Sequence, residues 1–278
     1  MYRLLSIELY KLKYSKAAKI LIAIYFGLLT SIALIASIEF DLGPIKFFLA
    51  NQGIFNFPYI WHFNTYMASV FKVFLLLVII SMMTSEYSYK TLKQNLIDGL
   101  SKKEFILSKF YTIIVFALAS TLFVFITSLI LGLIHSDNKH FSVIFSDLDY
   151  FIGFFVKLIS FFSLGLLFGI LIKKSAFAVA AVIVLYIVEN FVIRGYLYMR
   201  VGKREAIKSV MQFLPLESMQ NLIKEPFTRL KSFKIIVDNM KEEFVKDYSV
   251  GFLNIIIVIT WTVIFILLSY VLLKKRDL

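Results

Sequence analysis

The sequence predicts an all-α integral membrane protein in which a single transmembrane domain, residues 1–278, holds six spanning helices. Hydrophobic residues make up 60% of the chain and charged residues only 17%, with a mean hydropathy of +0.83, whereas soluble domains have about 45–50% apolar residues. The apolar residues also form continuous runs instead of alternating with polar ones. This pattern favours spanning helices over a β-barrel.

The composition also argues against several kinds of site. The chain has no cysteine, so it has neither disulfides nor a thiolate metal site. Its three histidines are His62, His135 and His140, and the last two stand near Asp137 at the loose spacing of a solvated loop, so we expect no metal site. The net charge of +12 is what lysine and arginine beside membrane spans produce, and we expect no nucleic-acid partner.

Six apolar runs each have roughly the 20 residues that a helix needs to cross the hydrocarbon of a bilayer. The first run is longer than the apolar core of a signal peptide, about 7–15 residues, which favours a retained span over a cleaved leader. The six runs are Ile20–Ile38, Asn64–Met83, Phe110–Ile134, Tyr150–Ile172, Ala176–Ile193 and Phe252–Leu273.

Basic residues mark one side of the membrane. Lysine and arginine are concentrated before the first span, in the second and fourth connections and after the last span, whereas the first and third connections are mixed or acidic. The positive-inside rule therefore predicts a multi-pass protein of the plasma membrane with both termini in the cytoplasm. The residues that set this orientation are Arg3, Lys11, Lys13, Lys16, Lys19, Lys90, Lys93, Lys102, Lys103, Lys109, Lys173, Lys174, Lys274, Lys275 and Arg276.

The segment 194–251 is predicted to be external. It is basic, but long loops follow the positive-inside rule poorly. Apolar residues at helical spacing in Ser209–Leu214, Glu217–Lys224 and Thr228–Phe244 predict one to three external or interfacial helices. A solvated loop is the alternative.

Residues 1–16 are predicted to form an amphipathic interfacial helix. Tyr2, Leu5, Leu9 and Leu12 recur at steps of three and four residues along one stripe. A helix of this kind lies in the cytoplasmic surface of the membrane before the first span. A frayed cytoplasmic tail is the alternative.

The chain turns polar between the second and third spans, over residues 84–109. Helical spacing predicts a helix over Glu86–Asp98, which Gly99 ends in a left-handed conformation. Ser101-Lys-Lys-Glu104 then has the pattern of a capping box that begins the helix of the third span. The sequence thus predicts a cytoplasmic helical hairpin, which is either an ordinary connection or a contact for a cytoplasmic partner.

Four segments of the chain carry short motifs. They are Glu8-Leu-Tyr-Lys11, the hairpin with Glu86, Thr91, Gly99-Leu-Ser101 and Lys109, then Phe213-Leu-Pro215, and the ending Lys274-Lys-Arg-Asp-Leu278. Together with the span layout of the whole chain, these segments resemble the ABC-2 type permease family, the membrane subunits of ABC exporters. Two positions depart from the family pattern: Lys90 stands where glycine is frequent, and Lys102 where arginine is frequent.

The resemblance implies a role for each piece. Residues 1–16 would be a connecting helix, residues 84–109 a coupling hairpin seated in a cleft of a separate P-loop ATPase, and the external segment a cap on the translocation path. Two permease copies, or one copy with a sister permease, would form that path within the membrane lipids. The residues implied to serve ATPase coupling are Glu86, Lys90, Thr91, Lys93 and Ser101.

The absence of several catalytic motifs agrees with ATP hydrolysis by a separate chain. The chain contains no Gly-x4-Gly-Lys-Ser/Thr, His-Glu-x-x-His or Gly-x-Ser-x-Gly. We therefore expect no catalytic residue and no cofactor on this chain, with ATP and Mg²⁺ bound by the partner ATPase. The predicted function is export of a lipid-like, peptide or drug-like amphipathic substrate from the cytoplasm or inner leaflet. A non-ABC secondary transporter or a membrane scaffold is the alternative, and a membrane enzyme is disfavoured.

Three charged residues, Lys72, Lys157 and Glu189, fall inside predicted spans. Counted from the cytoplasmic ends at about 1.5 Å per residue, they lie roughly 18, 24 and 22 Å up, in the outer half of the hydrocarbon. Because intramembrane charges need partners or a wet cavity, Glu189 is expected to pair with one lysine. The other lysine is expected to face the path and to favour an anionic or amphipathic substrate. Snorkelling of both lysines is the alternative. Gly165-x3-Gly169 is interpreted as close packing of the fourth span.

Overall fold

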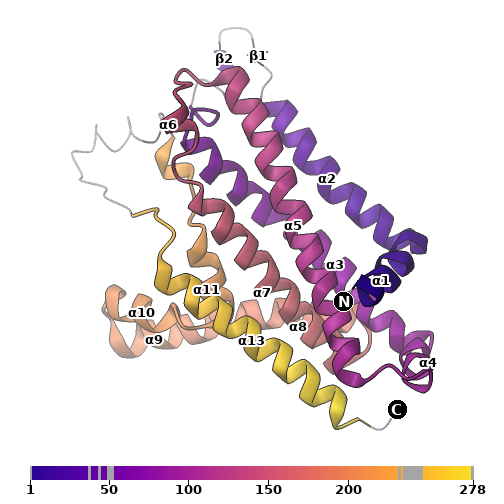
Figure 1. The fold of residues 1–278 in the computed structure, drawn as a ribbon. Coiled ribbons are helices and arrows are strands. Elements are labelled where there is room, and N and C mark those ends of the chain that lie inside the picture. The colour runs from indigo at the N-terminus through magenta and orange to yellow at the C-terminus, as the bar shows by residue number, and fades with distance from the viewer. Residues whose placement is uncertain are drawn as a thin grey trace.

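Long apolar helices make up most of the molecule, a computed structural model that describes residues 2–36, 39–42, 45–48, 53–230, 233 and 247–276 (Figure 1). The long helices are α2 (Lys16–Ala36), α3 (Tyr59–Ser88), α5 (Lys102–His135), α7 (Asp149–Ile172), α13 (Phe252–Lys274) and the continuous run α8 (Ser175–Ile187), η2 (Val188–Ile193) and α9 (Arg194–Val201). The short elements are α1 (Tyr2–Tyr14), α4 (Thr91–Ile97), α6 (Phe141–Ile144), α10 (Arg204–Met211), α11 (Pro215–Leu222) and η3 (Phe227–Arg229).

The described residues contain five helices that are long and apolar enough to cross a membrane, and six if α1 and α2 are counted as one bent span. Each of the six predicted spans falls on one of the long helices, although residues 37 and 38 of the first lie outside the described residues. The helix of the fifth predicted span does not end at Ile193. It passes through the π-helical turn η2 and continues as α9 to Val201. Multi-pass membrane architecture is therefore confirmed.

The first connection holds a β-hairpin that the prediction of an all-α chain missed. Strand β1 (Glu39–Leu42) pairs antiparallel with β2 (Ile45–Phe48), with Glu39 opposite Phe48 and Leu42 opposite Ile45. Aromatic and β-branched residues on both sides of Gly43-Pro44 are a strand and turn signal, which a search for membrane spans does not weigh.

Helix α7 is at the centre of the helical packing, against α3 on one side and α13 on the other (Figure 1). The Gly165-x3-Gly169 pair faces α3. A Cβ at Gly169 would lie 3.1 Å from Cβ of Met83, and a Cβ at Gly165 would collide with the side chain of Leu76. The two glycines therefore bring α3 and α7 together within one chain, as the packing interpretation predicts.

Helix α1 meets α2 at a bend of 88° and lies across the end of the bundle (Figure 1). Leu12 is buried, as the predicted apolar stripe requires, but Leu9 is 40% exposed. Glu8 is buried in its place, so the stripe was partly wrong: the inward face of α1 carries a carboxylate. Ile7, Tyr10 and Tyr14 form a second, outward apolar face, which is suited to a membrane interface.

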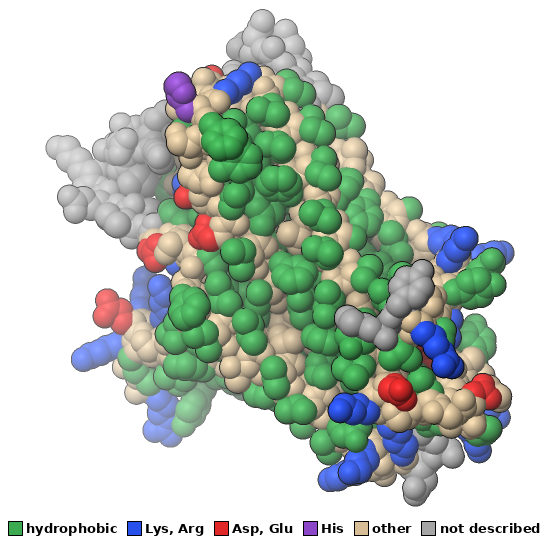
Figure 2. Space-filling view, viewed as in Figure 1, with side chains coloured by type: hydrophobic (Ala, Val, Ile, Leu, Met, Phe, Trp, Pro, Cys, Tyr) green, Lys and Arg blue, Asp and Glu red, His purple; other side chains and the backbone are tan. Residues whose placement is uncertain are grey.

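The four segments with basic clusters lie at one end of the bundle. The guanidinium of Arg276 donates to the carbonyl oxygens of Ile170 and Leu171 at the end of α7, and the Lys102 ammonium donates to the carbonyl oxygen of Lys274 at 3.2 Å. Figure 2 shows hydrophobic side chains over the middle of the face in view, with charged side chains gathered near α1 and α4 and over α9 and α10. The described residues nearest the two chain ends, in α1 and just after α13, therefore lie on the same side of the apolar band.

Candidate functional site

The hairpin between the second and third spans is built from three helices. Helix α3 continues to Ser88, and α4 begins at Thr91, so the predicted single helix over Glu86–Asp98 was wrong. The break is at Lys90, which has a φ of 57°. A left-handed residue cannot continue a right-handed helix, and the chain direction changes there.

The end of α4 and the start of α5 follow the predicted pattern. Gly99 has a φ of 93°, its N–H donates to the carbonyl of Leu96, and the N–H of Leu100 donates to the carbonyl of Asn95. These two bonds form a Schellman motif, which requires the positive φ that glycine adopts freely. Ser101 caps α5, with its hydroxyl accepting from the N–H of Glu104 and the Glu104 carboxylate accepting from the N–H of Ser101.

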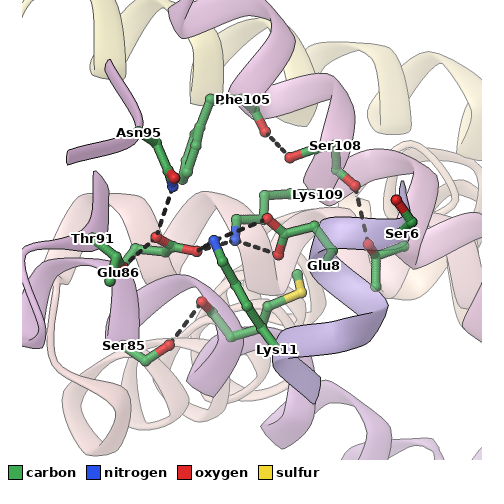
Figure 3. Close-up of polar contacts among 12 residues, drawn as sticks. Ser6, Glu8, Lys11, Ser85, Glu86, Thr91, Asn95, Phe105, Ser108 and Lys109 are labelled. Atoms are coloured by element: carbon green, nitrogen blue, oxygen red, sulfur yellow. Dashed lines mark hydrogen bonds and ion pairs between the residues drawn. The ribbon is translucent and has the colours of Figure 1, made fainter. Parts of the chain in front are cut away.

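Four charged side chains from α1, α3 and α5 meet beneath α4 (Figure 3). The Lys109 ammonium lies 2.6 Å from a carboxylate oxygen of Glu8 and 2.6 Å from Oε1 of Glu86. The Lys11 ammonium lies 2.8 Å from the same Glu86 oxygen and 3.5 Å from Glu8. We call Glu8, Lys11, Glu86 and Lys109 the charge cluster. It carries two positive and two negative charges, so its formal net charge is zero.

The second oxygen of Glu86 connects the charge cluster to α4. The Thr91 hydroxyl donates to Oε2 of Glu86 at 2.5 Å, and the Asn95 amide donates to the same oxygen at 3.5 Å. One carboxylate therefore contacts side chains from α1, α4 and α5 at once (Figure 3). A displacement of α4 must either carry Glu86 with it or break these bonds.

Burial makes the charge cluster sensitive to the loss of any member. Lys109 is 0% exposed and Glu86 is 2% exposed. Removing one partner from such a group leaves an uncompensated buried charge. Lys11 is only half-buried: partial burial acts to lower its pKa, but the carboxylates of Glu8 and Glu86 outweigh this effect and the pKa is raised.

The predicted coupling residues divide into an inner and an outer set. Glu86 is buried and Thr91 half-buried, and the hydrogen bond between them holds the start of α4 against the bundle. Lys90 and Lys93 are exposed, and so are Tyr89 at 79% and Ile97 at 69%. Tyr89 and Lys90 form the turn before α4, and we call Tyr89, Lys90, Lys93 and Ile97 together the outer face of α4. Ser101 is exposed and acts as the α5 cap.

An open cleft of about 430 Å³ lies beside the charge cluster, between α1, α4 and the first turns of α5. Its lining includes Arg3, Glu8, Asp98 and Glu104. The end of the bundle therefore has a protrusion, the outer face of α4, next to a recess, the open cleft.

Sequence reasoning named Glu8, Lys11 and Lys109 as family landmarks, and Lys11 and Lys109 as residues that set the orientation, but did not predict that they meet at one site. Glu8 and Lys109 are 101 residues apart, so spacing alone does not reveal their contact. The usable signal is local: Glu8 interrupts the apolar stripe of α1, and Lys109 stands beside the apolar run of α5. Buried positions rarely hold charges unless the charges are paired.

Glu189 does not pair with Lys72 or Lys157, and that expectation was wrong. Its carboxylate accepts hydrogen bonds from the backbone N–H of Leu216, at 3.0 Å, and of Glu217, at 3.1 Å. These N–H groups lie in the first turn of α11, where they have no acceptor within the helix and where a negative charge is favoured. Arg194 on α9 adds a second link, 2.5 Å from Glu217. Helix α11 thus begins at the depth of Glu189 and packs against the spanning helices α7 and α13.

The two intramembrane lysines approach each other instead. The Lys157 ammonium donates to the Ser69 hydroxyl at 3.3 Å, and the Lys72 ammonium donates to the Ser69 carbonyl at 2.9 Å. Lys72 also lies 4.7 Å from the centre of the Phe161 ring. The ion pairs among the described residues involve neither lysine.

Comparison with known proteins agrees with the arrangement of spans and hairpin. A family model described as ABC-2 family transporter protein matches residues 16–278, which include Glu86, Thr91 and Lys109 but not Glu8 and Lys11. No curated protein matches the chain. Members of this family are the membrane components of ABC transporters, normally without an ATPase site of their own, and they work with ABC ATPase subunits. The chain therefore belongs to the ABC-2 transporter family and is the membrane permease of an ABC transporter.

Proposed function

We propose that this permease is an exporter, driven by ATP hydrolysis in a separate ATPase, and that α4 is the helix through which the ATPase acts on it. The observation that carries this proposal is the charge cluster. It joins α1, α3 and α5 to one another, and through Glu86 it joins all three to α4. A force applied to α4 is thereby passed to two spanning helices and to the interfacial helix.

The outer face of α4 is the proposed contact for the ATPase. Tyr89 and Ile97 offer exposed apolar side chains, and Lys90 and Lys93 offer positive charge for acidic groups on the partner. ATP and Mg²⁺ are bound by that partner and not by this chain. The end of the bundle that carries α4, α1 and the C-terminus is accordingly the cytoplasmic end.

A second permease, either another copy of this chain or a sister chain, completes the translocation path in this proposal. The fifth span supports it, because only Ala178 and Val182 are buried in α8 while Phe177 and Phe191 on the same run are more than half exposed. The substrate is amphipathic, such as a lipid-like molecule, a peptide or a drug-like compound, and it moves outward from the cytoplasm or the inner leaflet.

Orientation is testable directly because the chain has no cysteine. A single cysteine at Lys93 and, separately, at Lys139 provides a label site on each side of the bundle. In intact cells a membrane-impermeant maleimide should label Lys139→Cys and spare Lys93→Cys, and permeabilisation should expose both. The reverse labelling would contradict the proposed topology.

Coupling is tested with surface variants that leave the charge cluster intact. Ile97→Asp and Lys93→Glu change the outer face of α4, whereas Phe141→Asp and Lys139→Glu make the same changes to exposed residues at the opposite end. The tagged permease should co-purify with an ABC-type ATPase whose ATP hydrolysis it stimulates. Both the association and the stimulation should be lost with the α4 variants and kept with the controls.

The result that would overturn the coupling proposal is an ATPase that binds and is stimulated equally by all four variants. Equal abundance and equal elution of the variants on size-exclusion chromatography make the comparison valid, since each substituted side chain is exposed.

A further inference from the structure

A polar pocket of about 740 Å³ lies between α3, α7, α9, α10 and α11 at the level of the intramembrane lysines. Five of its lining side chains are basic and two are acidic. The basic ones are Lys72, Lys157, Arg194, Lys208 and Lys224, and the acidic ones are Glu217 and Glu225. The pocket therefore has an excess of positive charge inside the membrane-spanning part of the protein.

Lys157 and Lys72 are the centre of this charge. Lys157 is 3% exposed, and both ammonium groups converge on Ser69 with no carboxylate from the described residues beside them. An ammonium group has three N–H donors, and each of these lysines donates one to Ser69. Two like charges in a low-dielectric setting repel each other, and an anion placed between them removes the repulsion.

Arg194 supplies a second, independent indication of an anion-binding site. One part of its guanidinium pairs with Glu217, but its Nε is buried and has no hydrogen-bond partner in the described part of the chain. Buried donors without a partner are rare in folded proteins. Arg194 lines the same pocket as Lys72 and Lys157.

An apolar pocket of about 260 Å³ adjoins the polar one. The two share Lys72, Tyr186 and Gln220, so Lys72 lies at their border. The apolar pocket is lined by side chains such as Leu76, Phe161 and Val179, which lie nearer the α4 end of their helices. The polar pocket extends the other way, to Lys224 and Glu225. The charged pocket and the apolar pocket thus follow one another along the membrane normal, in the same order as the headgroup and the acyl chains of a lipid in one leaflet.

We infer that these joined pockets bind an anionic amphiphile, with its phosphate or carboxylate headgroup between Lys72, Lys157 and Arg194 and its acyl chain in the apolar pocket. This names the substrate class of the exporter and in that sense rests on the proposed function. The apolar pocket fits a chain and not a second charged group, and the basic residues require a negative headgroup. The occupant is accordingly an anionic lipid-like molecule.

The test uses the full-length permease alone, in an uncharged maltoside detergent, so it needs no ATPase. Phosphatidylglycerol and phosphatidylcholine with the same acyl chains are added at equal concentration, and bound lipid is counted by native mass spectrometry. The wild type should retain about tenfold more phosphatidylglycerol than phosphatidylcholine. Lys72→Gln and Lys157→Gln should each reduce that preference severalfold, and Lys157→Arg should keep it.

Lys139→Gln is the matched control, since it removes one exposed charge outside the pockets. Glycerol phosphate, which has the headgroup chemistry without a chain, should not displace the bound lipid at the same concentration. Equal retention of the two lipids, an effect of Lys139→Gln as large as that of the pocket variants, or displacement by glycerol phosphate would overturn the inference. If Lys157→Gln gives no folded protein, the half-buried Lys72 carries the test. Failure here with intact ATPase coupling would reject only the substrate class.

Discussion

The ammonium group of Lys109 lies 2.6 Å from a carboxylate oxygen of Glu86, and neither side chain is more than 2% exposed. The pair joins the start of the third span to the end of the second, directly beneath α4. A charge-assisted hydrogen bond of this length between buried groups is strong. It contributes to stability only while both partners are present, because removing one leaves the other as an uncompensated buried charge.

Replacing Lys109 with methionine should destabilise the protein by about 3–5 kcal/mol, because two buried carboxylates are then left with only Lys11. Thermal unfolding in detergent, followed by fluorescence-detected size-exclusion chromatography, measures the effect. Lys103→Met is the control, since Lys103 is an exposed lysine on the same helix. The double variant Glu8→Met with Lys109→Met restores charge balance and should recover part of the loss. No recovery would mean that packing, and not charge, sets the cost.

Replacing Lys90 with glycine should stabilise the hairpin by roughly 1 kcal/mol. Lys90 has a φ of 57°, a left-handed conformation that costs a residue with a side chain about 1–2 kcal/mol, and greater freedom of glycine in the unfolded chain offsets part of the gain. Lys90→Val should destabilise it, because β-branched residues fit this conformation worst. Thermal unfolding of the purified permease distinguishes the two. A lower melting temperature for Lys90→Gly than for wild type would show that the lysine side chain has a stabilising contact.

Replacing Glu189 with alanine should detach the start of α11, because the N–H groups of Leu216 and Glu217 lose their acceptor at a cost of about 1–3 kcal/mol each. Glu189→Gln keeps one acceptor oxygen and should have an intermediate effect. Trp261 reports the change, since its indole N–H donates to the Phe213 carbonyl just before α11. A red shift of the tryptophan emission is expected for the alanine variant, and an unchanged spectrum would contradict the proposed role of Glu189.

Replacing Gly169 with leucine should weaken the contact between α3 and α7, because even a Cβ there lies 3.1 Å from Cβ of Met83. Overpacking of this kind costs roughly 1–3 kcal/mol. Gly27→Leu is the matched control, since nothing lies within 4 Å of a Cβ at Gly27. Melting temperatures of the two variants test the prediction, which fails if Gly27→Leu is the more destabilised.

Hydrophobic length and capping chemistry made much of this fold predictable. The five long apolar helices follow from the length of the apolar runs, and Ser101 as the α5 cap and Gly99 as the α4 terminator follow from rules that act within a few residues. The left-handed Lys90 was not predictable, because lysine has no preference for that conformation; the departure from the family's glycine was the only hint. The β-hairpin was missed because eight strand residues add little to a hydropathy profile.

The site residues were only partly predictable. Some of their partners are far away in the sequence, and others are backbone groups, which the identity of a side chain does not reveal. Glu86 and Thr91 were named from the family pattern, but the contact of Glu86 with Lys11, 75 residues away, emerges only from packing. Glu189 was assigned to a lysine because side-chain charges are visible in a sequence. Its actual partners are backbone N–H groups at a helix start, which every non-proline residue possesses.

The order in which the charge cluster is synthesised has a consequence for biogenesis. Glu8 and Lys11 leave the ribosome first, and Lys109 follows Glu8 by 101 residues, after two spans have been made. Until Lys109 is made, Glu8 and Glu86 have only Lys11 between them. Insertion of the third span adds Lys109 and completes the cluster, so the full set of ion pairs between α1, α3 and α5 can form only once the third span is in place.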